Sequence, residues 1–477
     1  MEKNSYESPL SSRYSSKEMQ EIFSPHFKYK TWRKLWVALA ESEKELGLPI
    51  TDSQIQEMRS HIDTLDFSTI TAYEKEFHHE VMAHIYAFGD QCKEAKGIIH
   101  LGATSSYVMD NGDLIQMEAG MQLLRGKCIL LLEKLNHLAL KHAGVPCLGY
   151  THFQPAQVTS VGKRISLWLQ DFLFDFKDLN RMTEDFPFLG VKGAIGSQAS
   201  FLILFEGNHE KVIELDLKVT QKMGFNDSFI ITSQTFPRKQ DQRVLSVLAG
   251  LGASAHKCAT DIRLLSHLNE VEEPFGISQV GSSAMPYKRN PIFAERICGL
   301  SRFLMNLWKN SAETASSQWL ERTLDDSSNR RLTIPEAFLS ADSILNLMFY
   351  LIDGLKFFPK MMEANIAEHL PYIATEHIMA GAVLQGKDRQ KVHEQLRLHC
   401  FNASKHKKET GHSIDLLSII AKDPEIGLSQ NQIAAIVKAE NFMGRSREQV
   451  LAFLKLEVVP ILDKYLTYKT TTPPIDL

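Results

Sequence analysis

Long stretches without proline, with apolar residues at helical spacing, dominate the middle of the chain. Three of them cover residues 156–186, 238–273 and 292–334. Because proline breaks helix interiors, each stretch can hold a helix of about 30 residues or more, on the order of 45 Å long. In the second stretch, small and apolar residues recur at a spacing near 3.5, which is typical of a helix packed closely against others. The members of this stripe are Leu245, Leu248, Gly252, Ala255, Ala259, Ile262 and either Leu265 or Ser266.

The rest of the chain also favours helices, so the pattern predicts a mainly α protein. Residues 32–46 keep one face apolar, residues 337–355 continue a helical pattern, and helices beyond Pro359 look shorter. One small domain cannot bury helices of the predicted length, which favours a bundle completed by other subunits. We therefore expect three domains: an N-terminal helical domain (1–104), a central long-helix bundle (105–357) and a C-terminal helical domain (358–477).

The composition is that of an ordinary globular protein. The 477 residues are 44% hydrophobic and 23% charged, with a formal net charge of −4. A general nucleic-acid binder would show a basic excess, although a local basic pocket for a small anion is compatible with this charge. We expect no membrane segment, because the N-terminus lacks a signal-peptide core and the apolar runs are too short to cross a bilayer. Six scattered cysteines without a CxxC pair favour free thiols and a cytoplasmic location.

No motif points to a metal or a cofactor. The GxxxxGK[ST] and GxGxxG fingerprints are absent, and so is the GxSxG elbow. Residues 77–84 contain three histidines, but a zinc-binding HExxH motif needs them four residues apart. The position four residues after His79 is Ala83. We therefore expect neither a metal nor a cofactor.

The polar segment 281–291 is the strongest candidate for chemistry. Gly281 gives backbone freedom and two prolines prevent a helix, so the segment is predicted to be a loop. It concentrates two hydroxyls, two cations and an amide, which suit the binding and deprotonation of a carboxylate-bearing substrate. From composition alone, a plain polar surface loop is the favoured interpretation.

The same segment resembles the GSSxMPxKxNP signature of the fumarase/aspartase superfamily at every fixed position. Ala284 and the run 288–290 are similar in particular to the adenylosuccinate lyase family. Other segments resemble this family in the same order along the chain, and the resemblance is weakest after about residue 360. These segments are 11–14, 98–106, 151–156, 159–164, 193–202 and 321–331.

This resemblance implies a three-domain helical subunit in a homotetramer, with pooled bundles and active sites where three subunits meet. It implies β-elimination of fumarate from adenylosuccinate, giving AMP, and from the succinyl-carboxamide ribotide of purine synthesis. The expected partners are thus small nucleotides, not nucleic acid or membrane. Another fumarate-releasing lyase, such as one acting on argininosuccinate, is an alternative, but segments 11–14 and 321–331 resemble nucleotide-binding ones. A non-catalytic homologue is the other alternative, and the intact Ser282 and His152 argue against it.

The resemblance also implies catalytic roles. Ser282 removes a proton from the succinyl carbon, and Lys288 with loop N–H groups stabilises the carbanion. His152 protonates the departing nitrogen, a role that suits imidazole, although a histidine among aromatic residues is more often structural. Glu295 matches a carboxylate that pairs with this histidine, and His79 matches a catalytic-site histidine.

The remaining matched positions are implied to contact substrate. Two depart from the family pattern, since His78 stands where the family has arginine and Glu80 where it has aspartate. A histidine donates fewer hydrogen bonds than an arginine, so local contacts are in doubt. The basic run around Arg330 could instead be a solvated helix end. The implied substrate contacts are Arg13, Tyr14, His78, Glu80, Thr104, Ser105, Gln234, Asn290, Arg296, Arg322, Ser327 and Arg331.

Overall fold

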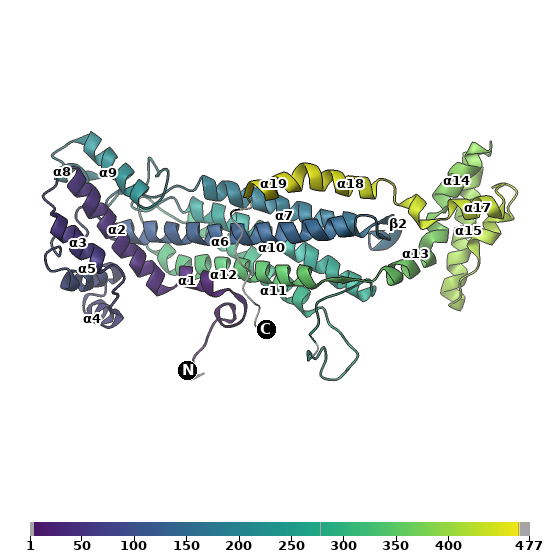
Figure 1. Cartoon of the computed structure of the whole chain (residues 1–477), viewed down its shortest axis with the longest axis horizontal. Coiled ribbons are helices and arrows are strands. Elements are labelled where there is room, and N and C mark those ends of the chain that lie inside the picture. The colour runs from purple at the N-terminus through teal and green to yellow at the C-terminus, as the bar shows by residue number, and fades with distance from the viewer. Residues whose placement is uncertain (1–3, 277, 466, 468–477) are drawn as a thin grey trace.

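The computed structural model describes residues 4–276, 278–465 and 467. Five long helices run along one axis, and smaller helices gather at both ends of this bundle (Figure 1). The expected mainly α fold with a central long-helix bundle is confirmed. The bundle helices are α6 (Ser105–Lys141), α7 (Val161–Glu184), α10 (Lys239–His267), α11 (Ile292–Ser316) and α12 (Asp325–Gly354).

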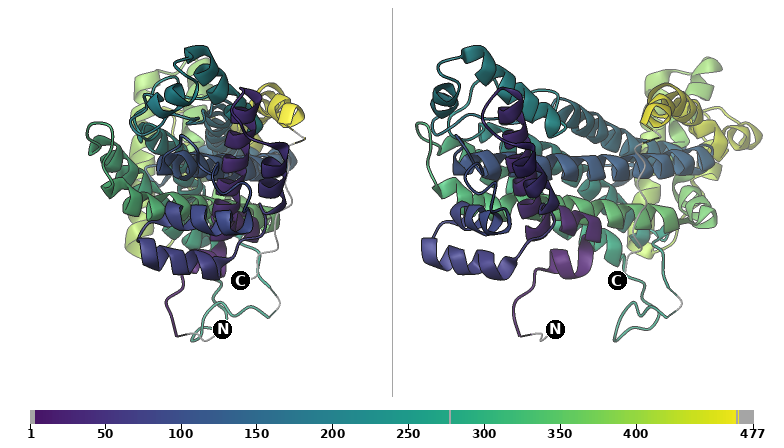
Figure 2. Two further views of the ribbon diagram at one scale, coloured as in Figure 1. Left: turned by 90° about the vertical axis from the view of Figure 1, so that its left-hand side faces the viewer. Right: turned by 60° about the vertical axis from the view of Figure 1, so that its left-hand side comes forward.

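One end of the bundle carries the N-terminal helices together with two short helices that follow α7 (Figures 1 and 2). Their starts follow local sequence signals, because Ser24 caps α2 with Pro25 at its first position and Thr51 forms a capping box with Gln54. The elements at this end are α2 (Pro25–Glu45), α3 (Asp52–Ser60), α4 (Phe67–Phe77), α5 (Glu80–Gln91), α8 (Ala199–Leu204) and α9 (His209–Lys222). The first two elements, the π-helix η1 (Leu10–Tyr14) and α1 (Lys17–Ile22), lie instead along the middle of the bundle, where Ser16 contacts Lys127 of α6 and Asp342 of α12.

The opposite end carries two small antiparallel sheets and the C-terminal helices. In the first sheet β1 pairs with β2 as a hairpin, and in the second β3 pairs with β4. Its elements are β1 (Pro146–Thr151), β2 (Gln154–Ser160), β3 (Val271–Glu272), β4 (Lys356–Phe357), α13 (Pro359–Ile373), α14 (Thr375–Leu384), α15 (Arg389–Thr410), α16 (Leu416–Ala421), α17 (Gln430–Ile436) and η2 (a 3₁₀-helix, Ala439–Phe442).

The last helices return along the bundle rather than staying with the C-terminal group (Figure 1). These are α18 (Ser446–Phe453), the π-helix η3 (Leu454–Val458) and α19 (Val459–Tyr465). Val450, Leu454 and Val458 join the bundle core, whereas the helices α13–α17 form a separate core with Leu148 and Val158 of the hairpin. We keep the three-domain division as a proposal, with the returning helices assigned to the central bundle.

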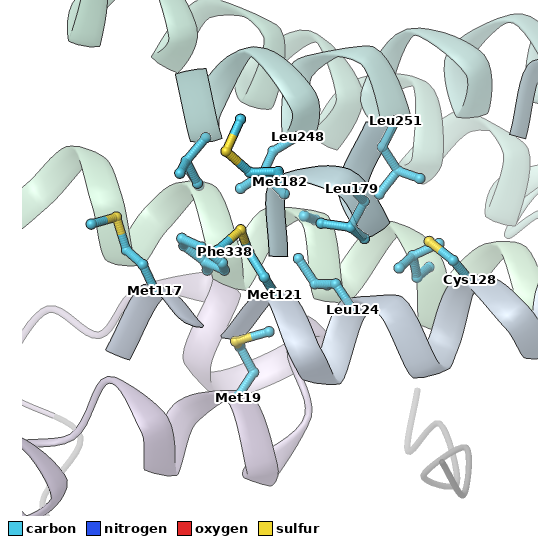
Figure 3. Packing of buried hydrophobic residues seen from close by; sticks show 14 of the residues in the cluster. Met19, Met117, Met121, Leu124, Cys128, Leu179, Met182, Leu248, Leu251 and Phe338 are labelled. Carbon is cyan, nitrogen blue, oxygen red and sulfur yellow. The ribbon is translucent and has the colours of Figure 1, made fainter. Parts of the chain in front are cut away.

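Helices α1, α6, α7, α10 and α12 meet in one hydrophobic core (Figure 3). Gly120 of α6 makes room for the ring of Phe338, since a Cβ there would lie 2.6 Å from a ring carbon. The predicted stripe on α10 is buried, with Leu265 rather than Ser266 as its last member. Gly252 in this stripe faces Leu304 of α11 at the distance of close packing, as its small size predicts.

The proline-free stretch 292–334 is divided between two helices. Helix α11 ends at Ser316, and α12 begins at Asp325 and continues through Pro335. Proline removes one backbone hydrogen bond, but most of the apolar residues that follow it on α12 are buried. Tertiary packing therefore decides the boundaries here. Among the described residues, no helix is both long and apolar enough to cross a membrane.

Candidate active site

A cavity of about 980 Å³ opens where the first turns of α5, α6 and α12 meet. This volume lies at the upper end of the usual range for small-molecule sites, about 300–1,000 Å³. Nine of the sequence-predicted site residues line it, and they come from four separate segments. These are His78, His79, Glu80, Thr104, Ser105, Gln234, Arg322, Ser327 and Arg331.

A tight connection between α4 and α5 places the histidine pair at the cavity. His78 ends α4 in the left-handed conformation with φ 49°. His79 is the N-cap of α5, where its Nδ1 accepts a hydrogen bond from the Met82 N–H at 3.3 Å. That bond assigns the proton to Nε2, which lies 3.4 Å from the Ser105 hydroxyl. The predicted site residue His79 is thus oriented by its own helix.

The N-terminus of α6 faces the same cavity. Its N-cap Thr104 makes no side-chain capping bond, so its hydroxyl is not used to close the helix. The first N–H groups of a helix lack intrahelical acceptors and carry a partial positive charge, which suits a carboxylate or a phosphate. Gln234 is fixed across the cavity, because its amide donates to the Ala194 carbonyl at 2.9 Å.

Glu80 lies between cations at the cavity wall. It accepts hydrogen bonds from Lys28 and Tyr29, both at 3.0 Å, and from Arg331. Burial acts to raise the pKa of Glu80, but the charges of Lys28 and Arg331 and the bonds from Lys28 and Tyr29 outweigh it and lower the pKa. The carboxylate is therefore ionised and pairs with a predicted substrate-binding arginine.

A buried charge network, which the sequence analysis missed, holds Arg322 in place. Asp326 accepts from Arg322 at 3.1 Å and from Arg238 at 2.6 Å. Arg238, with 2% of its side chain exposed, also donates to Asp110 of α6 at 2.8 Å. Three helices thus meet through one guanidinium. No local motif marks this network, since Asp110 is one of several charged residues of α6, but its burial demands a cation.

A second pair of carboxylates binds Arg330. Its guanidinium donates to Asp241 at 2.7 Å and to Asp113 at 2.8 Å. The interpretation of this basic run as a solvated helix end is therefore wrong for Arg330, which is buried. A smaller cavity of about 230 Å³ lies beside this network and shares Glu80, Arg322 and Arg331 with the larger cavity.

His152 lies on the turn of the β1–β2 hairpin, which the sequence analysis did not predict. His152 and Phe153 both have positive φ, 52° and 57°, as a two-residue type I′ turn requires. Glycine or asparagine usually fills such positions, and each non-glycine residue there costs about 1–3 kcal/mol. The side chains of both residues are exposed. The turn therefore carries backbone strain.

The polar segment 281–291, called the signature loop from here on, lies between β3 and α11. It extends away from the bundle (Figures 1 and 2). Asn290 closes its base by donating to the Gly281 carbonyl at 2.9 Å. The Ser282 hydroxyl accepts from the Met285 N–H at 3.1 Å and the Ala284 N–H at 3.4 Å. Both bonds stabilise a negatively charged oxygen, and Lys288 is exposed on the same loop.

The exit of the loop is fixed by Glu273, which accepts from the Phe293 and Ala294 N–H groups at 2.9 and 2.7 Å. Burial raises the pKa of Glu273, against the effect of these two bonds. Glu295 follows on the exposed face of α11, and the Arg296 guanidinium lies 5.7 Å from the Phe293 ring centroid. Glu273 was missed because it precedes the signature.

Within one chain the predicted residues fall into separate groups. The loop and the hairpin lie at the end of the bundle opposite the cavity (Figure 1). Helix α6 alone has 37 residues, so its ends are about 55 Å apart. Arg13 and Tyr14 lie on η1 and line neither cavity. The residues not brought to the cavity are His152, Ser282, Lys288, Asn290, Glu295, Arg296, Arg13 and Tyr14.

Comparison with known protein families gives two matches along the chain. The model of a family described as lyase matches residues 15–305, and a model described as adenylosuccinate lyase C-terminus matches residues 371–453. The second match lies where we found the sequence resemblance weakest.

Relatives with high similarity cover nearly the whole chain. The adenylosuccinate lyase of Schizosaccharomyces pombe is 46% identical over 95% of each chain. That of Schistosoma mansoni is 46% identical over 96% of each chain, and that of Saccharomyces cerevisiae is 45% identical over 98% of this chain and 97% of its own.

Among solved structures, the 3-carboxy-cis,cis-muconate lactonizing enzyme from Pseudomonas putida matches with a TM-score of 0.81 and 21% identity. It covers 96% of this chain and 99% of its own. The fumarate lyase from Mesorhizobium sp. BNC1 also has a TM-score of 0.81 and 21% identity, over 93% of this chain and 99% of its own. At this identity the likeness concerns the fold.

Proposed function

Because the chain belongs to the adenylosuccinate lyase family of the fumarase/aspartase superfamily, we propose that it cleaves adenylosuccinate into AMP and fumarate. The observation that carries the proposal is the cavity at the N-terminus of α6, which combines anion-binding groups with the oriented His79. Its volume suits a nucleotide that bears a succinyl group. The succinyl-carboxamide ribotide shares the ribose phosphate and the succinylamino group, so we propose it as a second substrate.

The reaction is a β-elimination whose atoms balance without a cofactor. A base takes a proton from the succinyl carbon beside a carboxylate, and the electron pair is delocalised into that carboxylate. The C–N bond then breaks, the pair forms the double bond of fumarate, and an acid gives a proton to the departing nitrogen. The nitrogen is a poor leaving group without this proton, so both an acid and a base are needed.

We assign the base to Ser282. A serine hydroxyl is a weak base at neutral pH, so its surroundings must favour the oxyanion. The two backbone N–H groups that donate to its oxygen support this assignment, as does Lys288 on the same loop. Lys288 and Asn290 are then available to stabilise the carbanion.

We assign the acid to His152, with Glu295 as its charge partner. The strained turn supports this role, because backbone strain persists where the surrounding structure holds a side chain in a required direction. Its exposure leaves the imidazole accessible to another surface.

We propose a homotetramer in which each cavity receives Ser282 and His152 from two neighbouring subunits. The separation of the cavity from the loop and hairpin along the bundle supports this assembly. Large apolar side chains exposed on the long helices also support it, since exposed patches of this kind commonly mark interfaces. These are Leu167, Phe174, Leu264, Phe303 and Trp308. A cytoplasmic location is part of the proposal, and the free state of all six cysteines supports it.

The test measures fumarate release from adenylosuccinate by absorbance. The wild type is expected to be active, and Ser282→Ala and His152→Ala each to lose about 10²–10⁴-fold in kcat with unchanged thermal unfolding. Near-normal turnover in either variant would contradict its assigned role. Mixed subunits of the two variants should regain activity, and no recovery after proven subunit exchange would exclude shared sites.

A further inference from the structure

Glu80 uses its two carboxylate oxygens for two different groups. Oε1 accepts from the Lys28 ammonium and the Tyr29 hydroxyl, each at 3.0 Å. Oε2 is bound by the guanidinium of Arg331. Lys28 and Tyr29 belong to α2, Glu80 to the first turn of α5, and Arg331 to α12. One carboxylate therefore joins three helices through two distinct oxygens.

The two sides of Glu80 differ in exposure. The side chains of Lys28 and Glu80 are 21% and 13% exposed, whereas that of Arg331 is 53% exposed. The Lys28 ammonium also lies 5.0 Å from the ring centroid of Trp32, a buried side chain. Arg331 borders both cavities. The Oε1 side is thus a fixed anchor, and the Oε2 side is a contact at the cavity surface.

The group formed by Lys28, Glu80 and Arg331 has one positive charge in excess, because two cations face one carboxylate. Tyr29 remains a hydrogen-bond donor, because burial and the neighbouring Glu80 charge raise its pKa far above neutral pH. Loss of the Arg331 contact would therefore still leave Glu80 with a cation and a hydroxyl. Such an arrangement allows Arg331 to exchange one anion for another.

We propose that Glu80 Oε2 stands where a substrate oxyanion binds Arg331, and that Lys28 and Tyr29 are positioning residues that hold the displaced carboxylate. The inference rests on the proposed function, whose substrate carries a phosphate and two carboxylates. A guanidinium binds carboxylate and phosphate oxygens with the same pair of N–H groups, so the exchange conserves its hydrogen bonds. Without Lys28, Glu80 has Arg331 as its one cation and competes with substrate more strongly.

The test is a double-mutant cycle of Lys28→Met and Glu80→Gln, with kcat and KM measured for adenylosuccinate cleavage by the whole enzyme. Lys28→Met is expected to raise KM about tenfold, with kcat within about twofold. In the double variant, KM should return to within about threefold of the Glu80→Gln value, because the competing charge is gone. Effects that multiply in the double variant would overturn the proposal, since Lys28 would then act on the substrate or on the fold directly.

Two matched variants separate positioning from general damage. Lys30→Met lies on the same helix and pairs with the exposed Asp63, so it should change neither constant. Tyr29→Phe should raise KM about two- to threefold, and this increase should vanish in the Glu80→Gln background. If Lys28→Met fails to fold, the Tyr29→Phe cycle replaces it, and an increase that persists without Glu80 counts against the proposal.

Inorganic phosphate binding, measured by calorimetry on the same proteins, distinguishes this inference from the proposed function. A wild type that does not cleave adenylosuccinate would contradict the function alone. Phosphate affinity should still fall about tenfold in Lys28→Met and recover in the double variant. Phosphate affinity that is equal in all four proteins would overturn the exchange at Arg331.

Discussion

The cavity end of the bundle and the opposite end use charge in different ways. At the cavity end, charged side chains pair with one another inside the fold, as Arg238 does with Asp110 and Asp326. At the opposite end, Ser282 and His152 lie on segments that project from the bundle, and the hydrogen bonds of the loop are mostly local. The charged residues of the cavity end are part of the buried core, whereas Ser282 and His152 belong to segments on the surface of the bundle.

This difference is what we expect of a site that separates binding from proton transfer. Binding groups gain from rigid positions, because their geometry must be ready before the substrate arrives. A mobile loop can close over a bound substrate and exclude water. The exposed apolar side chains of Val280 and Tyr287, 78% and 82% exposed, suit contact with another surface after closure.

The strongest way to break this contrast is to remove the central cation of the buried network. Arg238→Met leaves Asp110 without a guanidinium partner, whereas Asp326 keeps Arg322. Uncompensated buried charge of this kind destabilises a protein by about 3–5 kcal/mol. Thermal unfolding at fixed protein concentration should show a large fall in the midpoint.

The matched control is Arg289→Met at the other end. Arg289 pairs with Glu272 at 3.0 Å, but the two side chains are 57% and 38% exposed. An exposed pair contributes about 0–1 kcal/mol, so the midpoint should hardly move. Equal shifts for the two variants would remove the contrast between the ends.

The loop offers the converse test, in which activity falls and stability does not. A Cβ at Gly281 would lie 2.1 Å from the Lys288 carbonyl oxygen, so Gly281→Ala must move the base of the loop. We expect kcat to fall about 100-fold, because small displacements of a catalytic group have effects of this size. Gly276→Ala is the control, since among the described residues its Cβ would meet only Gln279, at 3.7 Å. Equal kcat values in the two variants would show that the loop base need not be rigid.

One buried carboxyl group at the cavity end is expected to lower the free energy of unfolding as pH rises. Glu43 of α2 is fully buried, and neither of its carboxylate oxygens has a hydrogen-bond partner among the residues that the structure describes. Burial raises the pKa of Glu43 to about 9 from 4.5. Between these values the folded state binds more protons than the unfolded state, so the free energy of unfolding falls as pH rises. The slope is on the order of 1 kcal/mol per pH unit, and Glu43→Gln should remove it.

Unfolding followed from pH 6 to pH 9 checks this prediction. Glu45→Gln on the same helix is the control, because hydrogen bonds from Lys222 and Lys218 lower the pKa of Glu45 and keep it ionised throughout this range. The Glu45→Gln variant should change the free energy of unfolding by the same amount at every pH, without changing its slope against pH. A wild-type curve that is flat over this range would show that Glu43 is not held in its neutral form.

The contrast between the ends also explains which parts of the fold were predictable. The stripe on α10 was visible because only one face of that helix is buried, which leaves a period in the sequence. Helix α6 has the longest uninterrupted helical stretch, yet we did not single it out. It is enclosed by other elements, so buried apolar residues such as Val108, Ile129 and Leu131 occupy several of its faces and no stripe remains.

The candidate site was predictable where a motif is local, and less so where contacts are long-range. His79, Ser105 and Arg331 came from matched segments, and the structure brings them to one cavity. The Arg238 network joins residues more than 80 positions apart, so no spacing rule could reveal it. The hairpin was missed because its turn lacks the asparagine or glycine that usually marks one.

A substitution in the β1–β2 turn has the smallest expected effect, and it tests the difference between the two ends of the bundle in most detail. Phe153 holds φ 57° without being a glycine, and its side chain is 51% exposed. Phe153→Gly should relieve strain and raise stability by up to about 1 kcal/mol, since little burial is lost. It should also lower kcat about two- to fivefold, because a freer backbone holds His152 less firmly. Asn269→Gly, at a φ of 57° elsewhere, should change stability alone. If Phe153→Gly left kcat unchanged, strain in the hairpin would have no part in catalysis.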